Sequence, residues 1–143
     1  MTASRRDNLM RIIIPALDDG DAVITDRFYD STSVYQGLVG GVNPEIITAL
    51  NTLCLDHISP DITILLDIDP DIGLKRSNRV ENAETRFENK GLEFHQQVRR
   101  AYLELAEANA DRFIVIDASR NEKAIHDDII AQLEPLLKSS QSL

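Results

Sequence analysis

Two short apolar runs, at residues 62–68 and 113–117, place the tightest limit on how this chain can fold. Both consist mostly of Ile, Leu, Val and Phe, which is the pattern of strands buried on both faces of a sheet. A long amphipathic helix is expected between them, from about residue 88 to 109, because apolar residues recur there at helical spacing: Phe94, Val98, Ala101, Tyr102, Leu105 and Ala108. Strands that alternate with helices predict the α/β class and a parallel sheet with right-handed crossovers.

The other segments follow the same alternation. A third strand is expected at 22–25, and helices are expected at 4–17, 30–38, 44–57, 70–77 and 125–136. In the first helix the residues expected to face inward are Leu9, Ile12, Ile13 and Ala16, and Pro15 is expected to disturb the hydrogen bonding. Three strands are few for a buried parallel sheet, which predicts that part of the domain lies outside this sequence.

Composition limits the class of protein. The 143 residues fit one domain, expected at 1–138 with a disordered tail at 139–143. No apolar run approaches the ~20 residues that span a bilayer, and residues 1–11 lack the apolar block of a signal peptide. We therefore expect a cytoplasmic protein that does not contact membranes. The net charge of −9 argues against nucleic acid as a partner.

A polar stretch at residues 26–37 is the first candidate site. Asp26 and Arg27 directly follow the strand expected at 22–25, and open α/β sheets bind ligands at the carboxyl ends of their strands. Four side chains on the next helix can converge on a small polar ligand: Ser31, Thr32, Tyr35 and Gln36. The alternative is a helix N-terminus capped by Asp30 or Ser31, with Arg27 as surface charge.

Basic residues form the second candidate. Positions 75–100 hold seven of the fifteen Lys and Arg residues, and Arg76, Arg79 and Arg86 lie where one expected helix leads into the next. Several arginines on a connector can close over a polyphosphate and offset its charge. The alternative is a solvated loop with surface ion pairs.

Other motifs do not indicate a metal site. Residues 67–71 begin like a calcium loop, but Ile72 stands where Gly is required and Asn78 where Glu is required. The three histidines have no ligand-like spacing.

The order of the motifs resembles bacterial thymidylate kinase (dTMP kinase). The matching residues, in order, are Asp26-Arg27-Phe28, Ser31, Tyr35-Gln36-Gly37, Pro60-Asp61, Leu66-Asp67-Ile68-Asp69-Pro70, Gly73-Leu74, Arg76, Arg86-Phe87-Glu88, Tyr102-Leu103 and Leu105-Ala106. The resemblance implies the P-loop nucleoside-monophosphate-kinase fold, with a parallel sheet flanked by helices. It also implies a homodimer that moves the γ-phosphoryl of MgATP to dTMP.

The resemblance implies roles for single residues as well. Arg27 would bind dTMP, with Asp26 near Mg²⁺ and the phosphates, and Arg5 would read the thymine base. The nucleoside pocket would be lined by Ser31, Thr32, Tyr35 and Gln36, with Tyr35 discouraging a 2′-hydroxyl. In the lid, at about residues 75–88, the catalytic arginines would be Arg76, Arg79 and Arg86. Glu88, the glutamate that follows the lid, would be a second candidate for the metal.

The sequence departs from the family at its start. Members begin with a strand, a Gly-rich phosphate loop ending in Gly-Lys-Ser/Thr, and a helix, and residues 1–143 contain none of these. Thr85 also stands where the family commonly has Asp. Two alternatives follow. The first is most of a dTMP kinase whose amino-terminal segment is absent here, inactive by itself. The second is a non-catalytic nucleotide-binding or dimerisation module that keeps the monophosphate pocket.

Overall fold

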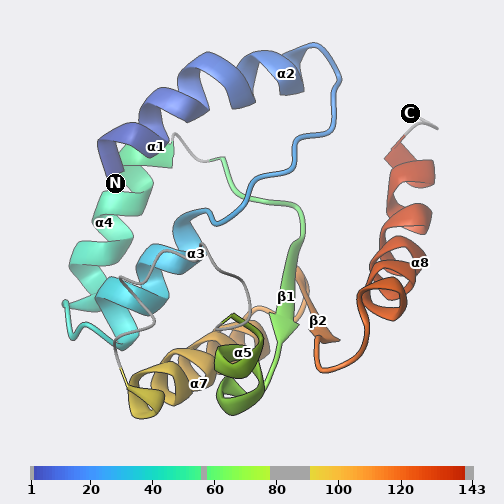
Figure 1. Ribbon diagram of the computed structural model, residues 1–143. Helices are drawn as coiled ribbons and strands as arrows, with labels where there is room; N and C mark the ends of the chain where they lie inside the picture. Colours follow the sequence, from blue (N-terminus) through green and yellow to red (C-terminus); the bar gives the residue numbers. More distant parts are fainter. Residues whose placement is uncertain (1, 56–57, 78–90, 141–143) are drawn as a thin grey trace. The chain divides into compact units, whose positions relative to one another are not determined.

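A computed structural model describes residues 2–55, 58–77 and 91–140. The chain divides into two compact units, Met1–Ser59 and Pro60–Leu143. Figure 1 labels the helices and strands of each. No helix in the described part of the chain is both long and apolar enough to cross a membrane.

The first unit begins with one continuous helical stretch, as expected for residues 4–17. It consists of α1 (Thr2–Asn8), the π-helical η1 (Leu9–Ile13) and α2 (Ile14–Asp18). The wide π-turn lies just before Pro15, whose ring would clash with the carbonyl four residues back in a regular α-helix. A π-turn also rotates the faces of the helix, because it holds an extra residue. Leu9 and Ile13 are buried as expected, but the expectation for Ile12 was wrong, since it is 62% exposed.

The rest of the first unit is also helical. The helix expected at 30–38 is confirmed as α3 (Tyr29–Thr32) with η2 (Ser33–Leu38), and Val34 is fully buried. A tight turn follows, in which Gly41 has a φ of 71° and a Cβ on Gly40 would lie 2.7 Å from the carbonyl oxygens of both Tyr35 and Gln36. The next helix, α4 (Pro44–Leu55), packs against α1 and η2. It is capped by Asn43, whose Oδ1 accepts from the Glu45 amide at 2.8 Å.

The strand expected at 22–25 is not formed. These residues are an irregular loop, and the Ile24 side chain is 94% exposed. A strand needs a paired neighbour to satisfy its backbone groups. Among the described residues the strands are β1 and β2, which pair with each other in the second unit. The apolar run at 22–25 therefore pairs with no strand of the described residues.

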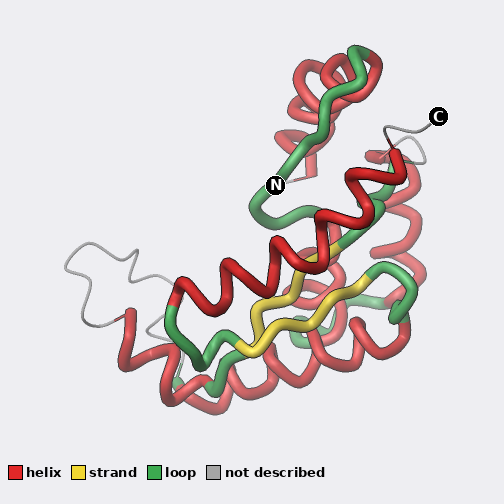
Figure 2. Tube along the Cα trace, turned by 90° about the vertical axis from the view of Figure 1, so that its right-hand side faces the viewer, coloured by secondary structure: helices red, strands yellow, loops and turns green. Residues whose placement is uncertain are grey.

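The second unit contains a parallel pair of strands, as predicted. β1 (Thr63–Asp67) and β2 (Phe113–Asp117) lie side by side (Figure 2), and the register aligns Asp67 with Asp117. Their connection includes α5 (Pro70–Ser77) and α7 (Leu92–Ala108). α7 packs on both strands and on α5, and it buries Val98 and Ala101, while Phe113 and Ile116 are buried from β2.

The last helix, α8 (Glu122–Ser140), packs against β2 and confirms the helix expected at 125–136. It includes the first two residues of the predicted tail, and residues 141–143 lie outside the described residues.

Candidate functional site

A cleft in the first unit brings together the loop at residues 25–28 and the first helical stretch. Its volume is about 460 Å³, and it is lined by Ser4, Arg5, Asp7, Asn8, Arg11, Ile12, Thr25, Asp26, Arg27 and Phe28. Three of the residues expected to bind substrate or metal, Arg5, Asp26 and Arg27, thus share one cleft. Asp7 and Arg11 were not predicted, and they form an exposed i,i+4 ion pair at 2.7 Å.

Arg5 is fixed at one end of this cleft. Its Nη1 donates to Thr32 Oγ1 at 2.9 Å, and its guanidinium lies 5.8 Å from the centre of the Phe28 ring. Burial lowers the pKa of Arg5, and the nearby Cys54 opposes that shift. An arginine remains charged through such a shift, so it presents a held cation and donor. The structure therefore joins Arg5 and Thr32, two residues that the family resemblance assigns to the same nucleoside.

Arg27 has an unusual backbone conformation. Its φ is 61°, the left-handed region that residues with a Cβ rarely occupy. The guanidinium lies 5.6 Å from the Tyr35 ring centre, and it forms no hydrogen bond or ion pair with the other described residues. The Asp26 carboxylate likewise has no hydrogen-bond or ion-pair partner among them. Strained residues with unused charged groups in a cleft are typical of ligand sites.

The helix after the loop carries buried polar residues. Asp30, Ser31 and Thr32 are all less than 8% exposed, and Tyr35 and Gln36 are half-buried. α3 begins after Phe28 and has no side-chain cap, so the alternative in which Asp30 or Ser31 caps this helix is wrong. Every buried polar side-chain atom in the described residues has a hydrogen-bond partner. The extent of burial of Asp30 was not foreseen, because polar residues at a helix start are usually exposed.

A protein-only metal site is not formed by the described residues, because no three of their His, Cys, Asp and Glu side chains gather. Mg²⁺ that accompanies a nucleotide is held mainly by phosphates and by one or two carboxylates. The unpartnered Asp26 fits the part of one such ligand. Glu88, the other predicted metal residue, lies outside the described residues, as do Arg79 and Arg86.

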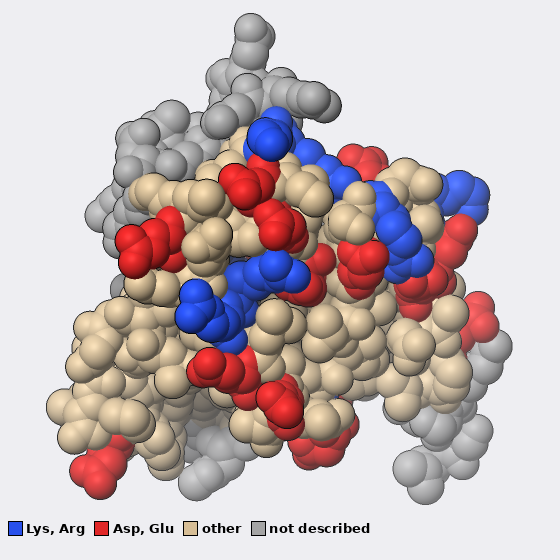
Figure 3. Space-filling view, turned by 90° about the horizontal axis from the view of Figure 1, so that it is seen from below, with Lys and Arg blue, Asp and Glu red and all other residues tan. Residues whose placement is uncertain are grey.

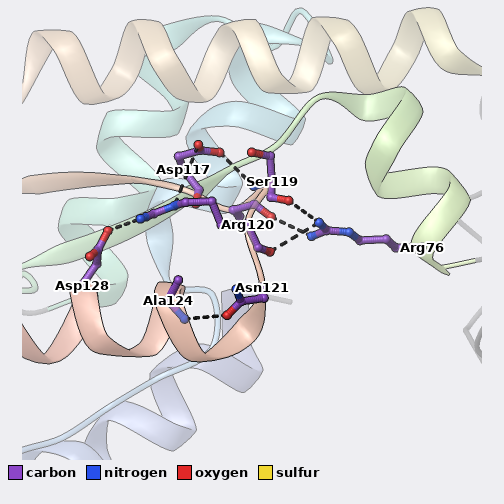
Figure 4. A network of polar contacts seen from close by, with 8 residues as sticks. Arg76, Asp117, Ser119, Arg120, Asn121, Ala124 and Asp128 are labelled. Atoms are coloured by element: carbon purple, nitrogen blue, oxygen red, sulfur yellow. Dashed lines mark hydrogen bonds and ion pairs between the residues drawn. The ribbon is translucent and has the colours of Figure 1, made fainter.

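Arg76 lies in the second unit, at the end of α5. It is bonded to the backbone of the loop after β2, at residues 118–120 (Figure 4). In the same loop, hydrogen bonds from Ser119 hold the pKa of Asp117 below its ordinary value, and the charges of Arg120 and Arg76 act in the same direction.

The carboxyl end of β1 is held by a second arginine. Arg99 of α7 donates from Nε and Nη2 to the two carboxylate oxygens of Asp67, at 2.7 and 2.8 Å, and its Nη1 lies 3.5 Å from Asp69 Oδ2. The hydrogen bond with Asp67 raises the pKa of Arg99. On the face shown in Figure 3, basic side chains are interspersed with acidic ones rather than collected in one patch.

Parallel strands that are flanked by helices and carry charged residues at their carboxyl ends define an α/β protein, a class whose open sheets bind ligands at that edge. Comparison with known proteins identifies the family, because the family model for thymidylate kinase matches residues 1–129. The chain belongs to the thymidylate kinase family, and the resemblance inferred from its motifs is confirmed.

Individual relatives agree. The thymidylate kinase of Dinoroseobacter shibae is 45% identical over 132 residues, covering 92% of this chain and 63% of the relative. That of Pelobacter propionicus is 44% identical over 136 residues, covering 92% and 62%. The crystal structure of thymidylate kinase from Ehrlichia chaffeensis matches with a TM-score of 0.68 and 32% identity, over 92% of this chain and 59% of that one. This match confirms the fold class, and the chain spans about 60% of the length of such relatives.

Proposed function

We propose that the protein is a dTMP kinase, which transfers the γ-phosphoryl group of MgATP to dTMP and releases dTDP. Membership of the thymidylate kinase family supports this function. The observation that carries it to particular residues is the cleft of the first unit, where the strained Arg27 and the unpartnered Asp26 face the same space as Arg5. An arginine that forms no hydrogen bond or ion pair with the described residues suits a phosphate, which it can bind through two parallel hydrogen bonds.

In this proposal the cleft takes the monophosphate. Arg27 binds the phosphate of dTMP, and Arg5, already oriented by Thr32, reads the thymine base. Ser31 and Gln36, on the helical segment that follows, are not among the residues that line the cleft, and in this proposal they would add polar groups beside it. Tyr35 forms a wall beside the deoxyribose, and its ring also supports the Arg27 guanidinium.

Phosphoryl transfer depends chiefly on positioning and on the stabilisation of charge. Asp26, with Glu88 as a second candidate, would hold Mg²⁺, and the metal would supply positive charge beside the phosphates. Of the three arginines expected in the lid, Arg79 and Arg86 are the candidates for stabilising the charge of the transferring group, because Arg76 is already bonded to the loop after β2. A transition-state arginine lowers kcat together with kcat/KM when it is removed, whereas a ground-state binder raises KM alone.

The test is a coupled assay of dTDP formation by the protein as its gene encodes it, with dTMP and MgATP. Single changes of Arg79 and Arg86 to Ala should lower kcat by more than about tenfold, ~1.4 kcal/mol, for at least one of the two. Binding of dTMP without turnover would instead support the non-catalytic nucleotide-binding module. The proposal includes a homodimer in the cytoplasm, which sedimentation and cell fractionation test separately.

Discrimination between deoxyribose and ribose substrates gives a sharper test of the place proposed for Tyr35. Changing Tyr35 to Ala should relax discrimination against the ribose analogue of dTMP by about tenfold, because a steric wall is removed. Tyr35→Phe is the matched control, since it keeps the ring. Equal losses of kcat/KM for the deoxy and ribo substrates in the Ala variant would place Tyr35 away from the sugar.

A further inference from the structure

Arg76 points its guanidinium at three consecutive carbonyl oxygens. Nη1 donates to Ala118 at 2.7 Å, and Nη2 donates to Ser119 at 2.5 Å and to Arg120 at 3.4 Å. Figure 4 shows the side chain reaching from α5 to the loop between β2 and α8. Both terminal nitrogens are therefore already used, by acceptors that belong to the backbone and cannot be lost by a side-chain change.

The loop that Arg76 binds is also held from its other side. Arg120 forms ion pairs with Asp128 of α8 and with Asp117 at the end of β2. The Ser119 amide donates to Asp117 Oδ1 at 2.8 Å, and Asn121 Oδ1 accepts from the Ala124 amide at 2.9 Å. Arg76 thus connects α5 to a loop that is already tied to both β2 and α8.

The opposite end of α5 is anchored too. Asp69 Oδ1 accepts from the Asp71 amide at 2.9 Å, which caps the helix, and its other carboxylate oxygen faces Arg99 of α7. Since α5 is held at its start by Arg99 and at its end by the loop, it is a fixed element of the second unit. A side chain that is bonded to the backbone in this way is better suited to fixing the position of the loop than to contacting a phosphoryl group during its transfer.

We propose that Arg76 is a positioning residue, which fixes the loop at residues 118–120 at the carboxyl end of β2. Its catalytic relevance rests on the proposed kinase function, because ligands of open α/β sheets bind at this edge. The clamp itself does not depend on that function. Arg79 and Arg86 are then the lid residues that would stabilise the charge of the transferring phosphoryl group.

The experiment compares Arg76→Met and Arg76→Lys with the neighbouring control Lys75→Met, in the protein as its gene encodes it. Met keeps much of the aliphatic stem but no donor, and Lys keeps the charge without the fork of donors. Amide hydrogen exchange at Ser119 and Ala124 should be at least tenfold faster in both Arg76 variants. The NMR titration of Asp117 should move to higher pH in Arg76→Met, and the Lys75 variant should match the wild type in both measurements.

Measurement of kcat distinguishes a positioning role of Arg76 from a catalytic role. If Arg76 is a positioning residue, kcat in Arg76→Met should stay within about tenfold of the wild type, while amide hydrogen exchange in the loop becomes faster. Unaltered exchange at Ser119, with or without a fall in kcat, would overturn the proposal, and so would full restoration of protection by Lys. If the Met variant does not fold, slow exchange of the Arg76 Nη protons in the wild type tests the same bonds. Absence of dTDP formation by the wild type would refute the kinase function and leave the exchange test intact.

Discussion

Arg27 combines two properties that rarely occur together unless a ligand is involved. Its backbone has a φ of 61°, a conformation that costs a residue with a side chain on the order of 1 kcal/mol. Its guanidinium is nevertheless exposed and unbonded to any other described residue. The folded protein gains little from this arrangement, so we attribute it to the orientation of the side chain toward the cleft.

The strained backbone of Arg27 predicts that relieving the strain will stabilise the fold but weaken binding. Arg27→Gly should raise the free energy of unfolding by up to about 1 kcal/mol, because glycine tolerates a positive φ. It should also weaken dTMP binding roughly 10- to 100-fold, since a charge-assisted contact is lost. Arg27→Ala is the control, and it should lose the same affinity without the gain in stability. Denaturant unfolding and calorimetric titration measure the two quantities, and equal stability of the two variants would contradict the strain.

At the level of elements, the Arg99–Asp67 pair joins α7 to β1. The pair is bidentate and partly shielded, with Asp67 only 21% exposed. Such a pair stabilises more than an open surface ion pair. We expect Arg99→Met to lower the free energy of unfolding by about 1–2 kcal/mol. The neighbouring control, Arg100→Met, should change it by less than about 0.5 kcal/mol. Similar unfolding midpoints for the two variants would show that the pair does not support the helix.

The loop after β2 predicts a pH effect. The pKa of Asp117 is lowered in the folded state, so its contribution to stability is present above its ordinary pKa and disappears as the pH falls through the folded pKa. Asp117→Asn keeps an oxygen acceptor for Ser119 but removes the charge. The wild type should therefore be the more stable protein at pH 7, and the difference should begin to shrink as the pH falls below about 4, toward the lowered pKa of the folded state. Unfolding midpoints between pH 7 and 3 check this, and a constant difference would contradict it.

The elements also show what can be predicted from a sequence. Residues 63–67 and 113–117 could be predicted as strands because each run is apolar on both faces. In the structure the two strands pair with each other. The run at 22–25 has the same composition, but a strand also depends on a neighbour that local sequence cannot supply. Arg5 and Thr32 could be assigned to one ligand only through family resemblance, because their hydrogen bond spans 27 residues of sequence. The bonds of Arg76 to backbone carbonyls have no sequence signal at all.

At the level of the whole molecule, the described residues supply the cleft that we propose for the monophosphate, and a charged sheet edge. They lack the backbone cradle with which phosphate loops hold the β- and γ-phosphates of ATP, and residues 1–143 contain no Gly-Lys-Ser/Thr sequence. We therefore predict that a polypeptide of residues 1–143 by itself forms no dTDP. The measurement is a coupled assay with dTMP and MgATP, with a complete relative as positive control. Sustained turnover by residues 1–143 would mean that other groups hold ATP.

The turn at Gly40 has a consequence for the gene that encodes this protein. A methyl group at this position would press on the carbonyl oxygens of Tyr35 and Gln36, which are backbone atoms of the proposed nucleoside pocket. Every amino acid that a single base change can produce from a glycine codon carries a Cβ atom. No single base change in the codon for Gly40 therefore yields a residue that avoids this contact, so missense changes there should destabilise the turn, although Gly40 is not among the residues that line the cleft.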